Sequence, residues 1–203
     1  MKLKNLIYLP FLFGLVACLP TGEEQNVDGE YEVSLSGSDL NYVPSTENQL
    51  DDPAYMDRIN TLIEVLAAEE YDNNVFINFI KAVAWTESAW EHYYEVDGHY
   101  YVFRGDEGHS YGMMQIYDTY HGEHPILQEN LEYGIAFAYE KYVRAKSNDC
   151  PSGSNKGSSI NATIRRAYAQ YNGGNGAMCR EDDARDNNLE DAYTQQPWLD
   201  YLP

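Results

Sequence analysis

The sequence predicts a mainly α-helical domain of the α+β class with one small β-hairpin. Apolar residues recur at helical spacing in several segments of residues 53–203, and one aromatic and β-branched stretch surrounds an Asp-Gly pair. Internal repeats are absent from the sequence. The roughly 150 residues beyond position 52 are enough for one hydrophobic core. We therefore expect a single domain over residues 53–203.

Residues 1–18 have the pattern of an export signal. Two lysines precede an apolar run that ends in small residues before Cys18. The run is shorter than the roughly 20 apolar residues of a transmembrane helix. Residues 15–18, Leu-Val-Ala-Cys, resemble the lipobox of bacterial lipoproteins, in which the cysteine is acylated and becomes the N-terminus. The resemblance implies an exported, lipid-anchored protein, and Leu19 after the cysteine implies the periplasmic side of the outer membrane. An ordinary signal peptide cleaved nearby is the alternative.

The segment that follows, residues 19–52, is polar and acidic, and we expect a flexible linker there. The whole chain has 13 Lys and Arg against 33 Asp and Glu, a formal net charge of −20. This excess of negative charge argues against a nucleic-acid partner, because too few cations are present to neutralise phosphates. An anionic membrane surface is equally unfavourable, so the lipid would have to provide the anchor.

Two helices are expected at the start of the domain. Asp52 and Pro53 suit the cap and first position of a helix. Apolar residues follow at helical spacing: Met56, Ile59, Ile63 and Leu66. A second helix is expected over residues 74–91, with an apolar stripe made of Phe76, Phe79, Ile80, Val83 and Ala84.

The pattern then changes to aromatic and β-branched residues over 93–104. Asp97-Gly98 at its centre predicts the turn of a β-hairpin. Residues 105–110 suit an acidic loop with two glycines. Helical spacing returns over residues 130–146 and 160–171, and we expect one more short helix in the acidic tail.

Three cysteines are present, and the lipobox-like motif accounts for Cys18. Cys150 and Cys179 are expected to form a disulfide if the protein is exported to an oxidising compartment. We predict no metal and no cofactor, because the chain has no Cys-x-x-Cys motif and its histidines lie in loop-like sequence. His121 and His124 flank Glu123, and a metal site there is the less favoured alternative to a solvated loop.

Glu87 continues the apolar stripe of the second expected helix, since it lies one and two turns after Val83 and Ile80. Apolar surroundings remove hydration from a carboxyl group and raise its pKa, as a general acid near neutral pH requires. Trp85 and Trp90 lie nearby in sequence and are candidates for apolar walls or a sugar-stacking surface. The alternative is a glutamate at a helix end that faces solvent.

Three segments in order carry a family resemblance. They are Glu-Ser-Ala-Trp at 87–90, Ser-Tyr-Gly-Met-Met-Gln-Ile at 110–116, and Ala-Tyr-Ala-Gln-Tyr-Asn-Gly-Gly at 167–174. They resemble the lytic transglycosylases of the soluble-murein-transglycosylase type, which share the lysozyme-like fold. The family pattern is a Glu-Ser pair at a helix end, then Gly-Leu-Met-Gln, then Ala-x-Tyr-Asn-x-Gly. Asn130 and Gly134 also resemble the family's Asn-x-x-x-Gly helix. The resemblance covers about residues 75–175 and implies a lysozyme-like domain.

The resemblance implies that Glu87 is the catalytic acid/base of a peptidoglycan-cleaving enzyme. The bond cut would be the β-1,4 bond between N-acetylmuramic acid and N-acetylglucosamine in the glycan strands. The substrate's N-acetyl group would assist at the anomeric carbon, and the sugar's 6-hydroxyl would then attack to give a 1,6-anhydro end. Core packing is the alternative for Met114 and Tyr171. The implied substrate-binding residues are Ser110, Met114, Gln115, Tyr171 and Asn172.

Residues 105–110 also resemble goose-type lysozymes, in which a Gly-Asp-x-Gly stretch precedes the glutamine motif. The aspartate there is implied to position water for hydrolysis, and Asp106 matches it. A second acidic position of those enzymes falls on Tyr117, so the match is incomplete. A hydrolase that uses Glu87 and Asp106 is thus the second hypothesis, with deacetylated, cationic peptidoglycan as a candidate substrate for an acidic protein. The third is a non-catalytic wall-binding lipoprotein, and a monomer is expected in each case.

Overall fold

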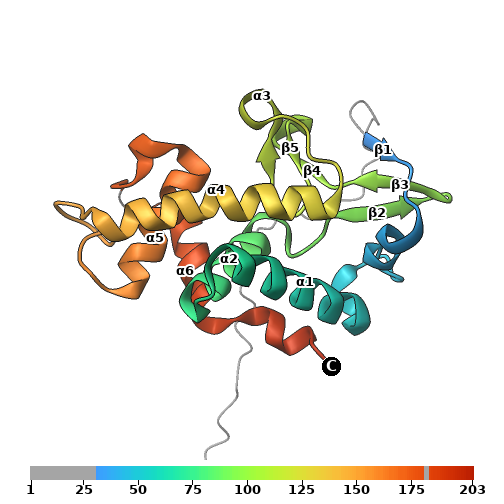
Figure 1. Cartoon of the computed structure of the whole chain (residues 1–203), viewed down its shortest axis with the longest axis horizontal. Helices are drawn as coiled ribbons and strands as arrows, with labels where there is room; N and C mark the ends of the chain where they lie inside the picture. The colour runs from blue at the N-terminus through green and yellow to red at the C-terminus, as the bar shows by residue number, and fades with distance from the viewer. Residues whose placement is uncertain (1–30, 181–182) are drawn as a thin grey trace, which may run out of the picture.

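A computed structural model describes residues 31–180 and 183–203 and shows a mainly α-helical α+β fold with small antiparallel sheets (Figure 1). The predicted fold class is confirmed. The predictions for residues 1–18, Cys18 and residues 19–30 lie outside the described residues. The helices are α1 (Pro53–Tyr71), α2 (Asn74–Ser88), α3 (Asp118–His121), α4 (Leu127–Ser147), α5 (Ile160–Gly173) and α6 (Ala184–Gln195). Short 3₁₀ helices are η1 (Gly37–Tyr42), η2 (Gln49–Asp51), η3 (Asp106–Gly108), η4 (Asn175–Ala177) and η5 (Pro197–Tyr201).

Helix α1 begins at the expected cap, and α2 begins at the expected position 74. The Asp52 carboxylate accepts a hydrogen bond from the backbone N–H of Tyr55, and Asn73 caps α2 in the same way. Helix α2 ends at Ser88, before the expected position 91, because Ala89 and Trp90 adopt positive φ angles of 50° and 66°. This change of backbone direction places the Trp90 ring in the core, where it is fully buried.

The predicted hairpin is present. Strands β2 (Tyr93–Val96) and β3 (His99–Val102) pair antiparallel around Asp97 and Gly98, which both have positive φ. On its other side β3 pairs with a strand that the sequence did not reveal, β1 (Tyr31–Val33). The strand order is therefore β1-β3-β2, with β1 at one edge.

Part of the expected linker is folded, which corrects the prediction for residues 19–52. Residues 31–52 contain β1, η1 and η2. The Tyr31 ring packs edge-on against Tyr111 at 5.5 Å between ring centroids, and Asp52 accepts hydrogen bonds from the N–H and hydroxyl of Ser45 at 2.9 and 2.7 Å. The few apolar residues of this segment are ordered by partners distant in sequence, which a search for periodicity does not detect.

The stretch between the hairpin and α4 is more regular than the acidic loop we expected. Strands β4 (Arg104–Gly105), β5 (Ser110–Tyr111) and β6 (Ile116–Tyr117) form a second antiparallel sheet, and η3 lies between its first two strands. Helix α3 follows β6 directly and stands above the long helix α4 in Figure 1. This small sheet holds the segment 110–116 in place.

Helices α4, α5 and α6 complete the domain. The long helix α4 runs across the molecule, and α5 packs along it (Figure 1). Helix α6 is the expected short helix of the acidic tail, and it packs against α2 and α5. The predicted disulfide is confirmed: Cys150, between α4 and α5, is bonded to Cys179, which follows η4.

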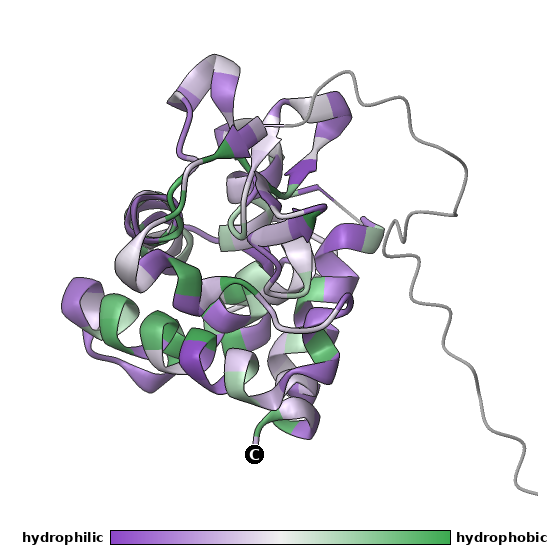
Figure 2. Ribbon diagram, turned by 90° about the vertical axis from the view of Figure 1, so that its right-hand side faces the viewer, coloured by the Kyte–Doolittle hydropathy of each residue, from purple (hydrophilic) through white to green (hydrophobic). Residues whose placement is uncertain are grey.

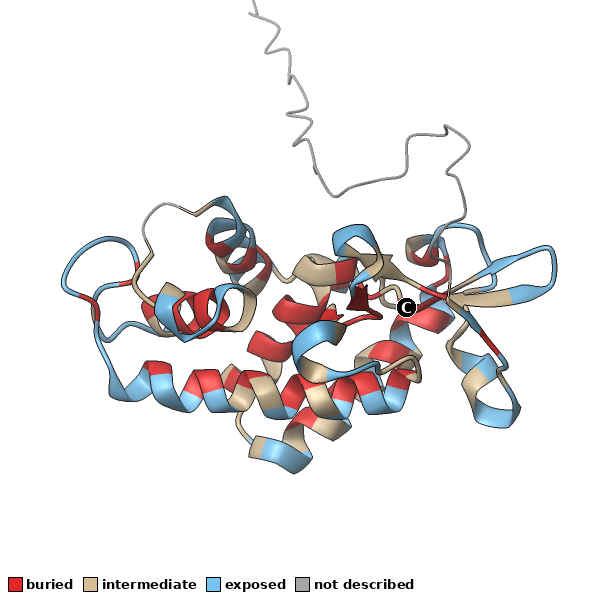
Figure 3. Cartoon of the chain, turned by 90° about the horizontal axis from the view of Figure 1, so that it is seen from above, coloured by how far each residue is buried: buried red, intermediate tan, exposed pale blue. Residues whose placement is uncertain are grey.

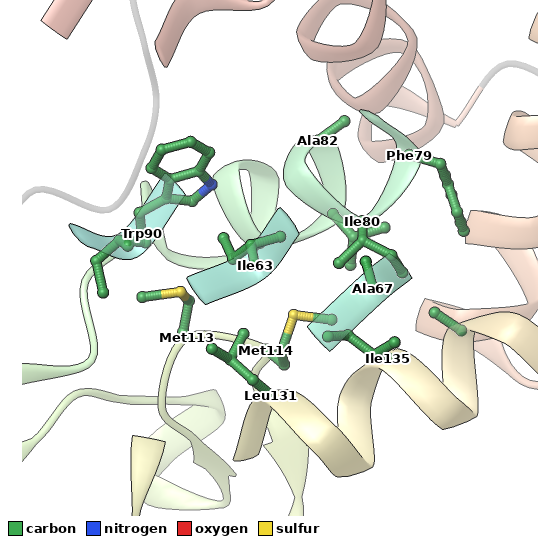
Figure 4. Close-up of a cluster of buried hydrophobic side chains, with 14 of the residues drawn as sticks. Ile63, Ala67, Phe79, Ile80, Ala82, Trp90, Met113, Met114, Leu131 and Ile135 are labelled. Atoms are coloured by element: carbon green, nitrogen blue, oxygen red, sulfur yellow. The ribbon is translucent and has the colours of Figure 1, made fainter. Parts of the chain in front are cut away.

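The core lies where these helices face one another, whereas the hairpin tip and the outer helix faces are exposed (Figure 3). Polar and apolar residues alternate along the helices in the hydropathy view (Figure 2), as in amphipathic helices. Met113 and Met114 lie at the centre of the core, between α1 and α4 (Figure 4). Within residues 31–180 and 183–203, no helix is both long and apolar enough to cross a membrane.

Candidate active site

Glu87 lies in the last turn of α2, after a buried apolar stripe. Ile80 and Val83 are fully buried on the preceding turns. The Glu87 residue is half-buried, and its Oε1 atom is buried with no hydrogen-bond partner in the described part of the chain. Burial raises the pKa of the carboxyl group from 4.5 to about 7. The prediction that Glu87 continues the apolar stripe is therefore confirmed.

Four neighbours act on the Glu87 carboxyl after burial itself. Hydrogen bonds from the Tyr168 and Asn172 side chains and the positive charge of Arg185 lower its pKa, whereas the negative charge of Asp106 raises it. Burial and, after it, the charge of Glu87 raise the pKa of the Tyr168 hydroxyl, so this phenol remains a hydrogen-bond donor. Tyr168, Asn172 and Arg185 thus favour the ionised form of the Glu87 carboxyl, whereas burial and Asp106 favour its neutral form.

Asp106 and Ser110 form one unit beside this carboxyl. Asp106 lies on η3 with a φ of 48°, is exposed, and accepts a hydrogen bond of 2.7 Å from the Ser110 hydroxyl. Ser110 itself is only 1% exposed, and its hydroxyl already contacts Asp106. Ser110 therefore positions Asp106 in the structure, and the expectation that it contacts substrate directly is not supported by its burial.

Met114 does not line an open surface, which corrects the role we expected for it. Its side chain is fully buried in the core (Figure 4). It packs so closely on α4 that a Cβ atom built at Gly134 would lie 2.7 Å from Met114 Cβ and Cγ. The backbone carbonyl of Met114 accepts a hydrogen bond of 2.6 Å from the Tyr171 hydroxyl. Met114 thus contributes its carbonyl to the site and its side chain to the core.

Tyr171 is half-buried, and the charge of Glu87 contributes to raising the pKa of its hydroxyl after burial, which is the largest cause. Tyr171, Tyr168 and Asn172 all come from the last turns of α5, so one helix end brings three side chains to the carboxyl of Glu87. The Asn172 Oδ1 atom is buried without a hydrogen-bond partner among the described residues. Unpaired buried oxygens are uncommon in folded proteins, and a catalytic role is one explanation for such atoms on Glu87 and Asn172.

Gln115 follows Met114 with a φ of 45° and is half-buried. Its side-chain amide donates a hydrogen bond of 2.7 Å to the carbonyl of Gly112. The Gln115 Oε1 atom lies so close to Gly105 that a Cβ there would be 2.2 Å away, so a side chain at position 105 would displace the end of the Gln115 side chain. The structure therefore places Gln115 against the loop that carries Asp106.

The family-like motifs included Asn130 and Ser88, but the sequence did not reveal that these residues hold segment 110–116. Asn130 is fully buried in α4; its Oδ1 accepts from the N–H of Met114 at 2.9 Å and its Nδ2 donates to the carbonyl of Tyr111 at 2.8 Å. The Ser88 hydroxyl donates to the carbonyl of Met113 at 2.9 Å. The Asn-x-x-x-Gly pattern was the available signal for Asn130.

His92 is a third such residue. The N–H of Met113 donates to His92 Nδ1 at 3.0 Å, so His92 Nε2 carries the proton and faces the carbonyl of Pro125 at 3.1 Å. Burial lowers the pKa of His92 to about 3, so the ring stays neutral. This histidine fastens the segment to the chain before α4 and takes no part in proton transfer.

The tryptophans nearest Glu87 in sequence, Trp85 on α2 and Trp90 just after it, pack against the C-terminal segment. Trp90 is fully buried and stacks on Trp198 at 5.5 Å, and Trp85 packs against both rings at 5.8 and 6.2 Å. The expected sugar-stacking role is therefore wrong for Trp90. These rings are the core contact between α2 and the C-terminal segment.

Two surface hollows of about 500 and 480 Å³ lie elsewhere in the described structure. One lies between α1 and α2 near Glu64 and Lys81, the other between α4 and α5 near Tyr142 and Arg166, and Glu87 lines neither. No group of three or more histidine, cysteine, aspartate or glutamate side chains suited to a metal ion occurs among residues 31–180 and 183–203.

Comparisons with protein-family models, with curated proteins and with solved structures found no match to this chain.

Proposed function

We propose that this protein cleaves the glycan strands of peptidoglycan, with Glu87 as the acid/base of a lytic transglycosylase. The observation that carries the proposal is the half-buried Glu87, whose carboxyl pKa is raised to about 7 by burial, beside Tyr168, Tyr171 and Asn172. The order of the three family-like segments along the chain agrees with it.

The environment of Glu87 suits both halves of such a reaction. Below about pH 7 the carboxyl is protonated and can give its proton to the glycosidic oxygen as the bond from that oxygen to the anomeric carbon breaks. The substrate's N-acetyl group would stabilise the positive charge that develops there. The carboxylate then takes the proton of the sugar's 6-hydroxyl as that oxygen bonds to the anomeric carbon. The products are an anhydro end and a free hydroxyl, and the carboxyl is protonated again.

The neighbours of Glu87 support this cycle. The Tyr168 and Asn172 hydrogen bonds and the Arg185 charge stabilise the intermediate carboxylate, while burial favours return of the proton. The unpaired oxygens of Glu87 and Asn172 supply acceptors for sugar hydroxyl or amide groups.

Hydrolysis is a second candidate, because the structure brings Asp106 within electrostatic reach of Glu87. Asp106 is exposed and held by Ser110, so it is able to contact water. Two carboxyl groups on either side of a glycosidic bond are the usual arrangement of glycosidases, and a water held by Asp106 would give a reducing end.

The lipid anchor at Cys18 and the periplasmic location remain predictions that accompany this proposal. Their support is the lipobox-like sequence and the Cys150–Cys179 disulfide, since disulfides persist in oxidising compartments.

The experiment compares Glu87→Gln with Glu91→Gln. Burial raises the pKa of Glu91 to about 7 as well, and Glu91 is only four residues away. The charge of Glu91, however, raises the pKa of Tyr55 on α1 and is not among the interactions of the α5 tyrosines. Purified protein is incubated with peptidoglycan sacculi, and the released fragments are identified by mass spectrometry. We expect anhydro ends, a loss of at least about 100-fold in Glu87→Gln, and little change in Glu91→Gln.

Each outcome separates the hypotheses. Reducing ends in place of anhydro ends would favour the hydrolase with Asp106. Absence of fragments from the unmodified protein would favour the wall-binding lipoprotein, and equal loss in both variants would remove Glu87 from its assigned role.

A further inference from the structure

A continuous row of aromatic rings leads away from Glu87 across the molecule. The Tyr171 ring contacts Phe137 at 5.3 Å between centroids, Phe137 contacts His121 at 4.7 Å, and His121 contacts Tyr120 at 6.4 Å. Tyr120 in turn stacks on Tyr117 at 5.6 Å with an interplanar angle of 27°. We call Tyr117, Tyr120, His121, Phe137 and Tyr171 the aromatic band.

Every member of the aromatic band is at least partly exposed, although the Lys141 ammonium lies over the Phe137 ring at 4.2 Å. Four of its members are half-buried, and Tyr120 is 80% exposed, more than any other large hydrophobic side chain of the described residues. Single exposed apolar residues are common on protein surfaces and need no function. Tyr120 differs from such single residues because its ring stacks on Tyr117 and because it belongs to the aromatic band, which begins at Tyr171 beside Glu87.

Helix α3, which carries Tyr120, is fastened at both ends although it is short. The N–H of Asp118 donates to the carbonyl of His109 at 2.8 Å, and His109 Nδ1 lies 3.3 Å from the Asp118 carboxylate. At the other end His121 Nδ1 lies 2.7 Å from the hydroxyl of Tyr133, a residue of α4. These contacts fix α3 above α4, where Figure 1 shows it. Rings held in advance lose little conformational freedom when a ligand binds.

We propose that Tyr120, stacked on Tyr117, is a binding platform for a sugar residue of the glycan strand, remote from the bond that Glu87 cleaves. This inference rests on the proposed function, because it takes the same strand to follow the aromatic band. The apolar face of a pyranose ring packs on an exposed aromatic ring. Exposed polar groups for sugar hydroxyls are available on Thr119, next to Tyr120 in sequence, and on His109, whose ring lies 5.6 Å from Tyr117. The carboxylate of Asp118, two residues before Tyr120, favours a neutral or cationic glycan over an anionic one.

The test uses N-acetylglucosamine oligosaccharides of two lengths, a trisaccharide and a hexasaccharide, and calorimetric titration. All proteins carry Glu87→Gln, so that the ligand is not consumed. Tyr120→Ala removes the ring, Tyr120→Phe keeps it, and Leu199→Ala removes another exposed apolar side chain on η5, which is 55% exposed. Thermal unfolding of each variant checks that it is folded.

We expect Tyr120→Ala to bind the hexasaccharide about five- to tenfold more weakly, as loss of one aromatic contact implies. Tyr120→Phe and Leu199→Ala should bind it like the parent, and trisaccharide affinity should change less than hexasaccharide affinity. Equal hexasaccharide affinity in Tyr120→Ala and its parent, or no hexasaccharide binding by the parent, would overturn the platform.

Failure of the platform and failure of the proposed function are distinguishable. If sacculi are cleaved but Tyr120→Ala binds normally, only the platform is wrong. If no cleavage occurs but hexasaccharide binding depends on the Tyr120 ring, the platform stands on a wall-binding protein.

Discussion

Replacing Glu87 with glutamine should stabilise the protein above pH 7 and leave its stability near pH 4 almost unchanged. Burial holds the pKa of this carboxyl near 7 in the folded protein, against 4.5 for the group in the absence of that environment. Between these two pH values the folded protein keeps a proton that the unfolded chain has lost. Stability therefore falls as pH rises through this window and is level above it. Glutamine has no proton to lose and does not show this fall.

The size of the effect follows from the interval between the two pKa values. At about 1.4 kcal/mol for each pH unit, the interval corresponds to about 3 kcal/mol of unfolding free energy. This is a ceiling, because Glu87 is partly exposed and its charged form keeps some hydration. For a domain of this size a gain of that ceiling would raise the unfolding temperature by about 6 to 12 °C.

The assay is denaturant unfolding of both proteins at pH 4, 5, 6, 7 and 8. The difference between their unfolding free energies should grow from pH 4 to pH 7 in favour of the variant. A difference that stays constant across this range would refute the burial argument for Glu87. Glu91→Gln should show a similar growth, because burial also raises the pKa of Glu91 to about 7, but without loss of glycan cleavage.

Three further predictions concern the surroundings of the site. Asp106→Asn removes a negative charge that raises the pKa of Glu87, so the alkaline limb of the pH profile of kcat/KM should move to lower pH. An unchanged alkaline limb would show that the Asp106 charge does not affect the pKa of Glu87. Cys150→Ser opens a loop with a sequence separation of 29 and should lower the unfolding free energy by about 3 kcal/mol in denaturant titration; a loss under about 1 kcal/mol would contradict this. Gly134→Ala brings a Cβ within 2.7 Å of Met114 Cβ and should lower the unfolding free energy by about 1–3 kcal/mol in the same titration. An unchanged unfolding free energy would show that the core around Met114 rearranges to accommodate the methyl group.

The helices were predictable because their signals are local. The cap of α1, the stripe of α2 and the Asp-Gly turn of the hairpin each lie within a few residues of the element that they define. Strand β1 has only three residues and depends on pairing with β3, some 70 positions away, so no local pattern reveals it.

The candidate site was predictable where a side chain belongs to a helix stripe, as Glu87 does. The role of Met114 was predicted wrongly because a motif fixes the position of a residue along the chain but not the direction of its side chain. The Met114 side chain points into the core, where it packs on the bare backbone of Gly134. Tyr168 and Arg185 were missed, since their effect on the pKa of Glu87 depends on how α5 and α6 pack on α2.

Strand β1 has a practical consequence for truncated forms of the protein. A fragment that began at Pro53, where the first long helix starts, would lack β1 and leave β3 as an unpaired edge. That edge carries Tyr100, Tyr101 and Val102, and an exposed aromatic and β-branched edge recruits strands from other molecules. A fragment meant to stay in solution at high concentration should therefore start upstream of Tyr31.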